Sequence, residues 1–460
     1  MHQPAKQPHF AMMVLAASLG FALVQLDVSV INVALARMGA DLHTGIAGLQ
    51  WVVDAYALAF AGLLLSAGAL GDQIGARKTF IFGLLVFTAA SAGCGLAPNV
   101  ATLIVARVIQ GAGAASLVPC SLALINHASH HDPEQRARAV SLWTAAGGIG
   151  LSAGPVLGGI LTDALGWRSI FLINLPVGLA GIWFASRFLQ ESGPRRAGFD
   201  PAGQLLSVAT LSLLTGAIIQ AGAAGWCAPV VLGALSLALV LGVWFLIAER
   251  RSPAPMLPLS FFLNVTFSAA TVFGLLINLT LYGMIFVFGL YLQQVRGFSP
   301  TRAGIAFLPF SVTLTFSNVI NGSLSKAWAA RRLMVVGTVL GAIGFALLHG
   351  LTATSTYPAM LPGLLILPLG VGLAVPAMTA SLLGTVPKTR SGVAAGVLNT
   401  VRQSAGAVGV ALSGAFFAAA GIPGMQIAFA SFGILLTVAA LVAGLGIRNR
   451  GPSERLTANG

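Results

Sequence analysis

Long apolar runs dominate the chain, and short polar segments separate them. The runs recur at roughly 20 residues, the length that a helix needs to cross about 30 Å of hydrocarbon. A helix satisfies its own backbone hydrogen bonds, which lipid cannot do. The pattern therefore predicts fourteen membrane-spanning helices, at residues 11–35, 50–71, 79–97, 101–124, 137–163, 168–189, 201–221, 228–248, 265–292, 302–324, 333–350, 358–384, 392–419 and 425–447.

The positions of Lys and Arg test this number of spans. When the loops are numbered alternately from an inner N-terminus, eighteen of the 24 cationic residues fall in inner segments and four in outer ones. The other two, Arg107 and Arg402, lie within spans. Lys and Arg accumulate in cytoplasmic loops. The bias predicts that both termini are cytoplasmic, and one span more or fewer would destroy it.

Composition and charge narrow the class of protein. Only 8% of the residues are charged, whereas a soluble domain carries about 25%, so we expect lipid to cover most of the surface. The net charge of +13 would also suit a nucleic-acid binder. Because the cations sit in short clusters between apolar runs, we expect no nucleic-acid partner. The three cysteines and the histidines at 127, 130 and 131 lack metal-ligand spacing, so we expect no metal and no cofactor.

A repeated loop indicates two related halves. GALGDQIGARK (68–78) follows span 2, and GSLSKAWAARR (322–332) follows span 10. Internal repeats of this kind are typical of transporters. The interpretation divides the chain into an N-terminal six-helix bundle (1–190), linkers with two extra helices (191–258), a C-terminal six-helix bundle (259–450) and a cytoplasmic tail (451–460).

Charges inside the spans are the first candidate functional residues, because burying a charge in a membrane is costly. Asp27, Asp54 and Arg107 all fall in the outer half of the N-terminal bundle. An acid there can take up a proton from outside, and a neighbouring Arg tunes its proton affinity. We therefore predict proton coupling by these residues. The alternative is a static ion pair that holds spans 1, 2 and 4 together.

The C-terminal half contains no Asp or Glu between Glu249 and Glu454. Its substrate contacts must then be apolar, aromatic, neutral polar or made by Arg402, which has three conceivable partners: backbone carbonyls, a carboxylate across the cavity or an anionic ligand. The alternative for a stripe of Phe and Tyr on a membrane helix is packing against other helices or contact with lipid. The candidates for the substrate cavity are Asn278, Tyr282, Phe286 and Gln293 in span 9 and Asn399, Arg402 and Gln403 in span 13.

Span 5 contains GGIGLSAGPVLGG (147–159). The Gly154–Pro155 step interrupts the backbone hydrogen-bond ladder and favours a bend that controls leakage. The alternative is ordinary close packing of helices on glycine.

Together these segments resemble the major facilitator superfamily, and within it the fourteen-span drug/proton antiporter family. The similar segments are LDVSVINVALARM (26–38), GALGDQIGARK, LIVARVIQGAGAASLVP (103–119), GPVLGG (154–159) and GVLNTVRQ (396–403). The resemblance implies alternating access, in which two bundles rock around a central cavity while protons enter and substrate leaves.

The resemblance also implies residue roles. It gives Asp27 and Arg107 a role in coupling, and it gives Asp72 and Arg77 a role in a cytoplasmic gate latch. Gln73 and Ala76 stand where the loop motif usually has basic residues, so the latch carries less charge than the pattern. The residues of the cytoplasmic gate motif are Gly68, Asp72, Gly75, Arg77 and Lys78, and those of the span 5 antiporter motif are Gly154, Pro155, Gly158 and Gly159.

We therefore predict a proton-coupled exporter of amphipathic small molecules, a monomer in the bacterial inner membrane that is driven by the proton gradient. The alternatives are a dedicated exporter of one endogenous metabolite or antibiotic and a proton-coupled uptake symporter. No HExxH or nucleotide-binding loop occurs, so we expect neither an enzyme nor an ATP-driven pump.

Overall fold

The computed structural model describes residues 7–129, 132–191, 200–252, 255, 257–387 and 390–447. All the regular elements among these residues are helices. Fourteen helices are long and apolar enough to span a membrane, from Phe10–Val33 to Ile422–Gly446, and they confirm the predicted spans to within a few residues. The predicted tail, 451–460, lies outside the described residues.

The N-terminal half packs around α5. Helices α3 and α4 both lie along α5, α1 packs against α6, and α8 packs against α1 and α4. Side-chain caps begin two of these helices, because Asn99 accepts from the Thr102 amide and Asp132 from the Glu134 amide. The helices are α1 (Gln7–Val30), α2 (Leu35–Asp41), α3 (Ile46–Ile74), α4 (Ala76–Gly95), α5 (Val100–Ala128), α6 (Pro133–Leu165), α7 (Ser169–Leu172) and α8 (Asn174–Phe188).

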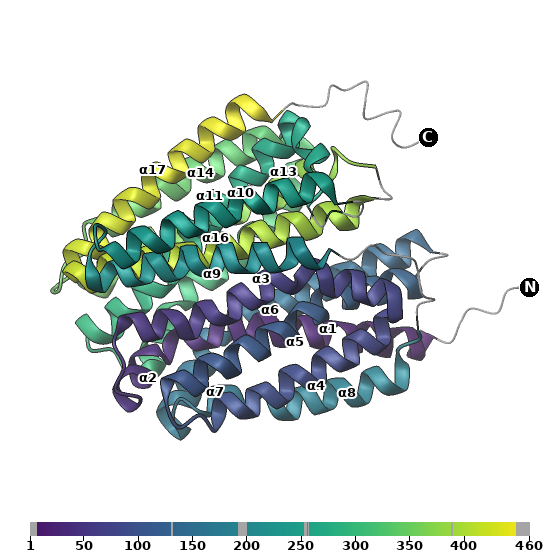
Figure 1. Ribbon diagram of the computed structural model, residues 1–460, viewed down its shortest axis with the longest axis horizontal. Coiled ribbons are helices and arrows are strands. Elements are labelled where there is room, and N and C mark those ends of the chain that lie inside the picture. The colour runs from purple at the N-terminus through teal and green to yellow at the C-terminus, as the bar shows by residue number, and fades with distance from the viewer. Residues whose placement is uncertain are drawn as a thin grey trace, which may run out of the picture.

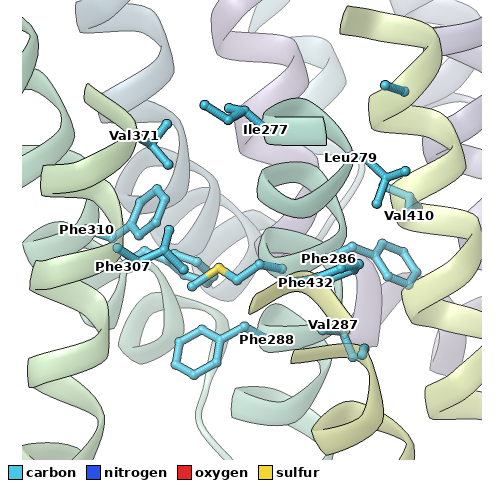
Figure 2. Close-up of a cluster of buried hydrophobic side chains, with 14 of the residues drawn as sticks. Ile277, Leu279, Phe286, Val287, Phe288, Phe307, Phe310, Val371, Val410 and Phe432 are labelled. Atoms are coloured by element: carbon cyan, nitrogen blue, oxygen red, sulfur yellow. The ribbon is translucent and has the colours of Figure 1, made fainter. Parts of the chain in front are cut away.

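Apolar packing dominates the C-terminal half. Helix α14 packs against α15 and α17, and α11 packs against α16. Figure 2 shows part of a buried cluster in this half, in which Phe286 and Phe288 come from α11, Phe307 follows α12, and Phe432 comes from α17. The helices are α11 (Val265–Leu290), α12 (Pro300–Ala306), α13 (Leu308–Ala327), α14 (Ala330–His349), α15 (Tyr357–Leu383), α16 (Ser391–Ala420) and α17 (Ile422–Gly446).

The two halves meet along two seams, α3 with α16 and α6 with α12 and α13 (Figure 1). We call the end at which α1 begins the proximal end and the other the distal end. At the distal end Gln50 of α3 donates to the Ala411 carbonyl over 2.7 Å, and the Thr301 amide donates to Asp163 of α6 over 2.8 Å. Near the middle, Ser152 bonds Thr315 over 3.0 Å. These hydrogen bonds therefore join the two halves at the distal end and near the middle.

The two extra helices, α9 (Pro201–Ala224) and α10 (Pro229–Arg251), cover one of these seams. Helix α9 packs against both α3 and α16, whereas α10 packs on α9 (Figure 1). Gln204 of α9 donates to the Gly62 carbonyl and accepts from Ser66, both in α3. Farther along α9, Gly222 lies directly against Ala415 of α16. Helix α9 therefore bridges the two halves, and α10 shields it on the outside.

Replacing Gln204 tests how α9 is held. Gln204→Ala leaves buried polar groups of α3 without partners, so we expect a loss of about 1–3 kcal/mol, seen as a lower thermal midpoint in detergent. Leu205→Ala is the matched control, because the neighbouring Leu205 is 72% exposed and makes no such bond. Equal midpoints for the two variants would show that Gln204 does not anchor the helix.

Candidate functional site

Asp27 of α1 lies at the centre of a buried polar network. Its side chain is fully buried. Arg107 Nη1 lies 2.6 Å from Asp27 Oδ2, so the two form an ion pair between α1 and α5. Gln110 Nε2 and Asn174 Nδ2 donate to Asp27 Oδ1 over 2.8 and 2.9 Å. Each carboxylate oxygen is therefore satisfied, as a buried charge requires.

Ser91 adds α4 to this network. Its hydroxyl oxygen accepts from Gln110 over 2.8 Å and from Asn174 over 3.3 Å, and the hydroxyl donates to the Phe87 carbonyl. Gln110 in turn accepts from Arg107 over 2.7 Å. The ion pair thus joins α1, α4, α5 and α8, and it is part of the framework of this half.

Arg107 also contacts α3. Its Nε donates to the Val52 carbonyl over 3.1 Å, and its guanidinium carbon lies 4.2 Å from the centre of the Tyr56 ring. A cation over an aromatic face is attracted by the ring electrons. Val52 and Tyr56 stand two residues before and two after Asp54, so Arg107 touches α3 on both sides of that acid.

Asp54 has a different environment from Asp27. It is fully buried, yet neither of its carboxylate oxygens has a hydrogen-bond partner. It lines a cavity between the two halves together with Arg107, Tyr282 and Gln403. An ionised carboxylate in this position would be a buried charge without compensation. The two acids that the sequence presented as equivalent are therefore distinct.

The structure separates the other cavity candidates. Tyr282 and Gln403 line the cavity with Asp54, and Tyr282 also lines a second, apolar cavity with Pro155 and Phe310. Phe286 instead lies in the buried cluster of Figure 2, which agrees with the alternative of packing.

The amides of span 9 are directed along their own helix. Asn278 donates to the Gly274 carbonyl over 2.8 Å, and Gln293 donates to the Gly289 carbonyl over 3.3 Å. Asn399 and Arg402 of span 13 are both partly exposed. Neither lines the cavity around Asp54.

The span 5 motif packs closely on both halves. A Cβ on Gly158 would lie 2.6 Å from the Val30 carbonyl of α1, and one on Gly159 would lie 2.5 Å from the Pro300 carbonyl of α12. Gly154 lies against Ser29 of α1. Helix α6 continues through Pro155. The glycines thus bring α6 against both neighbours at the distal seam.

The loop motif forms a tight turn at the proximal end. Gly75 has a φ of 107°, a conformation that favours glycine, and it separates α3 from α4. The amides of Arg77 and Lys78 donate to the two carboxylate oxygens of Glu191 over 3.0 and 3.3 Å. The Arg77 side chain donates to the Ser186 carbonyl over 2.6 Å. The loop is therefore fastened to the end of α8.

The remaining residues of this motif have other surroundings. Gly68 packs against Pro119 of α5, where a Cβ would lie 3.5 Å away. Asp72 is exposed, and it takes part in neither of the two ion pairs that the described part of the chain forms. The implied role of Asp72 in a cytoplasmic latch therefore has no ion pair behind it among the described residues in this conformation.

Sequence reasoning missed several residues that complete these sites. Gln110 could have been predicted from the sequence, because it stands three residues after Arg107 and so shares its helical face. Asn174 and Ser91 were isolated polar residues in apolar runs, and Glu191 was one acid in a polar segment. Only the fold shows that they converge.

The buried ion pair generates a stability prediction. Asp27→Asn leaves Arg107 charged and buried, so we expect a loss of about 3–5 kcal/mol in the free energy of unfolding, measured by denaturation in detergent. The double variant Asp27→Asn with Arg107→Gln removes both charges and should recover most of that loss. Asp54→Asn is the control, because Asp54 has no hydrogen bond to lose. A single variant as stable as the parent would contradict the role of the pair.

The contact of Glu191 generates a local prediction. Glu191→Ala removes the acceptor for two amides at the start of α4, which we expect to cost about 1 kcal/mol and to speed hydrogen exchange at Arg77 and Lys78. Asp72→Asn, in the same loop, should leave that exchange unchanged. Exchange that is equally fast in both variants would show that Glu191 does not hold the loop.

Comparisons with known proteins agree with this geometry. The sequence model of the Major Facilitator Superfamily matches residues 17–410 and, in an overlapping match, 271–459. The chain is 38% identical to a methylenomycin A resistance protein of Bacillus subtilis over 93% of this chain and 92% of that protein. It is 35% identical to the multidrug resistance protein Stp of Mycobacterium tuberculosis, over 88% of this chain and 75% of that one.

The fold is also found among solved structures. A bacterial homologue of the human lysosomal transporter Spinster, in an inward-facing conformation, superposes with a TM-score of 0.70 at 17% identity. The superposition covers 97% of this chain and 100% of the other. The sequence matches and the shared fold confirm the predicted resemblance. The chain belongs to the Major Facilitator Superfamily.

Proposed function

We propose that the protein is a proton-coupled exporter of amphipathic small molecules, and that Asp54 carries the proton. The observation that supports this most is that Asp54 is buried and unpartnered in a cavity beside a fully satisfied acid, Asp27. A group that binds and releases a proton must be able to exist without its charge. Asp54 has this property, because no bond within the described residues depends on its ionisation.

Arg107 connects the two acids. It is paired with Asp27 and touches α3 on both sides of Asp54. When Asp54 loses its proton, its new charge attracts the guanidinium and competes with Asp27. Protonation of Asp54 therefore decides how firmly Arg107 holds α1, and this is the step by which a proton changes the N-terminal half.

The distal closure supplies the other part of an alternating-access cycle. The halves are joined at the distal end by Gln50 and Asp163, and their seams are packed on Gly159. We assign the proximal end to the cytoplasm, in agreement with the cation bias. In this state the substrate would enter from the cytoplasm, and breaking the distal contacts would release it outside.

The names of the relatives support export. Resistance proteins of this size and family remove toxic compounds, and the bacterial relatives agree with an inner-membrane location. A dedicated exporter of one endogenous product would use the same machinery, and growth inhibition by a panel of toxic compounds separates the two. The relatives are transporters rather than enzymes, and a monomer is sufficient, because both halves of the cavity come from one chain.

Replacing the proposed proton carrier tests the proposal. Asp54→Asn keeps the shape of the side chain but cannot release a proton. In everted vesicles we expect export driven by an imposed pH gradient to fall at least tenfold, to the level of vesicles without the protein. Substrate binding at equilibrium should change little. The measurement is dye accumulation as a function of the imposed gradient.

Gln403→Asn is the matched control, because it alters the same cavity without removing an acid. That variant should keep its dependence on the pH gradient even if its rate changes. Undiminished gradient-driven export by Asp54→Asn would show that the proton binds elsewhere.

A further inference from the structure

Arg402 lies beside the cavity between the halves. It is in α16, about one turn before Gly406. Gly406 lines the cavity. A Cβ on Gly406 would lie 2.9 Å from the Tyr282 ring of α11. Arg402 Cγ lies 3.6 Å from the position of a Cβ on Gly274, also in α11. Arg402 therefore sits between α16 and α11, directly before Gln403, which lines the cavity.

Arg402 is a charge without a counter-charge. The C-terminal half has no acid between Glu249 and Glu454. The ion pairs of the described residues join Arg107 to Asp27 and Arg168 to Asp41, and Arg402 belongs to neither. Its Nε is buried and has no hydrogen-bond partner. The residue as a whole is partly exposed.

A guanidinium stays protonated inside a protein, so this charge cannot be removed by releasing a proton. Keeping it within a membrane span is costly unless an anion approaches it. The other buried cation, Arg107, is already neutralised by Asp27. Among the described residues, Arg402 is thus an uncompensated positive charge next to Tyr282, which lines both the cavity with Asp54 and the apolar cavity.

We propose that Arg402 binds the carboxylate of the exported molecule, so that the substrates are amphipathic acids. This inference rests on the proposed export function and names its substrate class. Planar carboxylates pair with both terminal nitrogens of a guanidinium. The apolar cavity lined by Ile285, Phe307 and Phe310 then receives the hydrocarbon part of the molecule.

The direction of charge movement agrees with an acidic substrate. An anion that leaves the cell and a proton that enters both move positive charge inward. An inside-negative membrane potential therefore drives both steps. A cationic substrate would have to leave against that potential.

The experiment measures binding to the purified protein in detergent. The first pair of probes is dansyl-phenylalanine, which carries a carboxylate, and its methyl ester, which is uncharged. Further fluorescent acids are compared with their esters in the same way. We expect the parent protein to bind the acids more tightly than the esters. Arg402→Gln should weaken binding of the acids roughly tenfold to a hundredfold and leave the esters unchanged. Arg402→Lys keeps the charge and should retain part of the preference.

Arg390→Gln is the matched control, because it removes an equal charge at the exposed start of the same helix. It should leave the ratio of acid to ester affinity unchanged. Acids that bind no better than esters to the parent protein would overturn the proposal. So would an equal loss for acids and esters in Arg402→Gln, which is the result expected if Arg402 serves Asp54. Because binding needs no pH gradient, this outcome is separate from failure of proton coupling by Asp54.

Discussion

The ion pair between Asp27 and Arg107 organises the N-terminal half. In a membrane a charge must find its partners within the protein, and this pair draws them from α3, α5 and α8. Ser91 fixes two of the amides that hold Asp27. The helices around α5 are therefore positioned by polar contacts as well as by packing. This arrangement also leaves Asp54 as the acid that no neighbour satisfies.

The C-terminal half is built on a different principle. Without acids, it is held by apolar side chains and by close approaches such as that of Gly409, where a Cβ would contact the Leu279 backbone carbonyl of α11. Small residues at such crossings increase van der Waals contact between helices. Arg402 is an exception within this half, because it is a partly buried charge that packing does not explain. The buried acids of the spans thus belong to the N-terminal half, whereas the C-terminal half contributes Arg402.

The sequence was sufficient for the architecture because membrane insertion depends on local properties. A run of about 20 apolar residues predicts a span whatever it packs against. The cation bias then predicts which end of each span faces the cytoplasm. It could not predict the site in full, because the decisive contacts join distant residues. Asp27 and Asn174 are 147 residues apart, and Gln50 and Ala411 are 361 apart. Likewise, the pattern of aromatic residues could not show that Tyr282 lines the cavity while Phe286 lies in the core.

The positions of Gln50 and Asp54 on α3 suggest how the proposed protonation of Asp54 would act on the contact that joins the halves at the distal end. Gln50 and Asp54 are four residues apart, so they share one face of the helix and lie about 6 Å apart along it. Gln50 bonds α16 across the seam, and Asp54 lines the cavity to which Gln403 of α16 also contributes. A charge that forms on Asp54 is therefore felt one turn from the contact that closes the distal end. The same helix carries the proposed proton site and the closure, so a change at one would reach the other without any intermediate element.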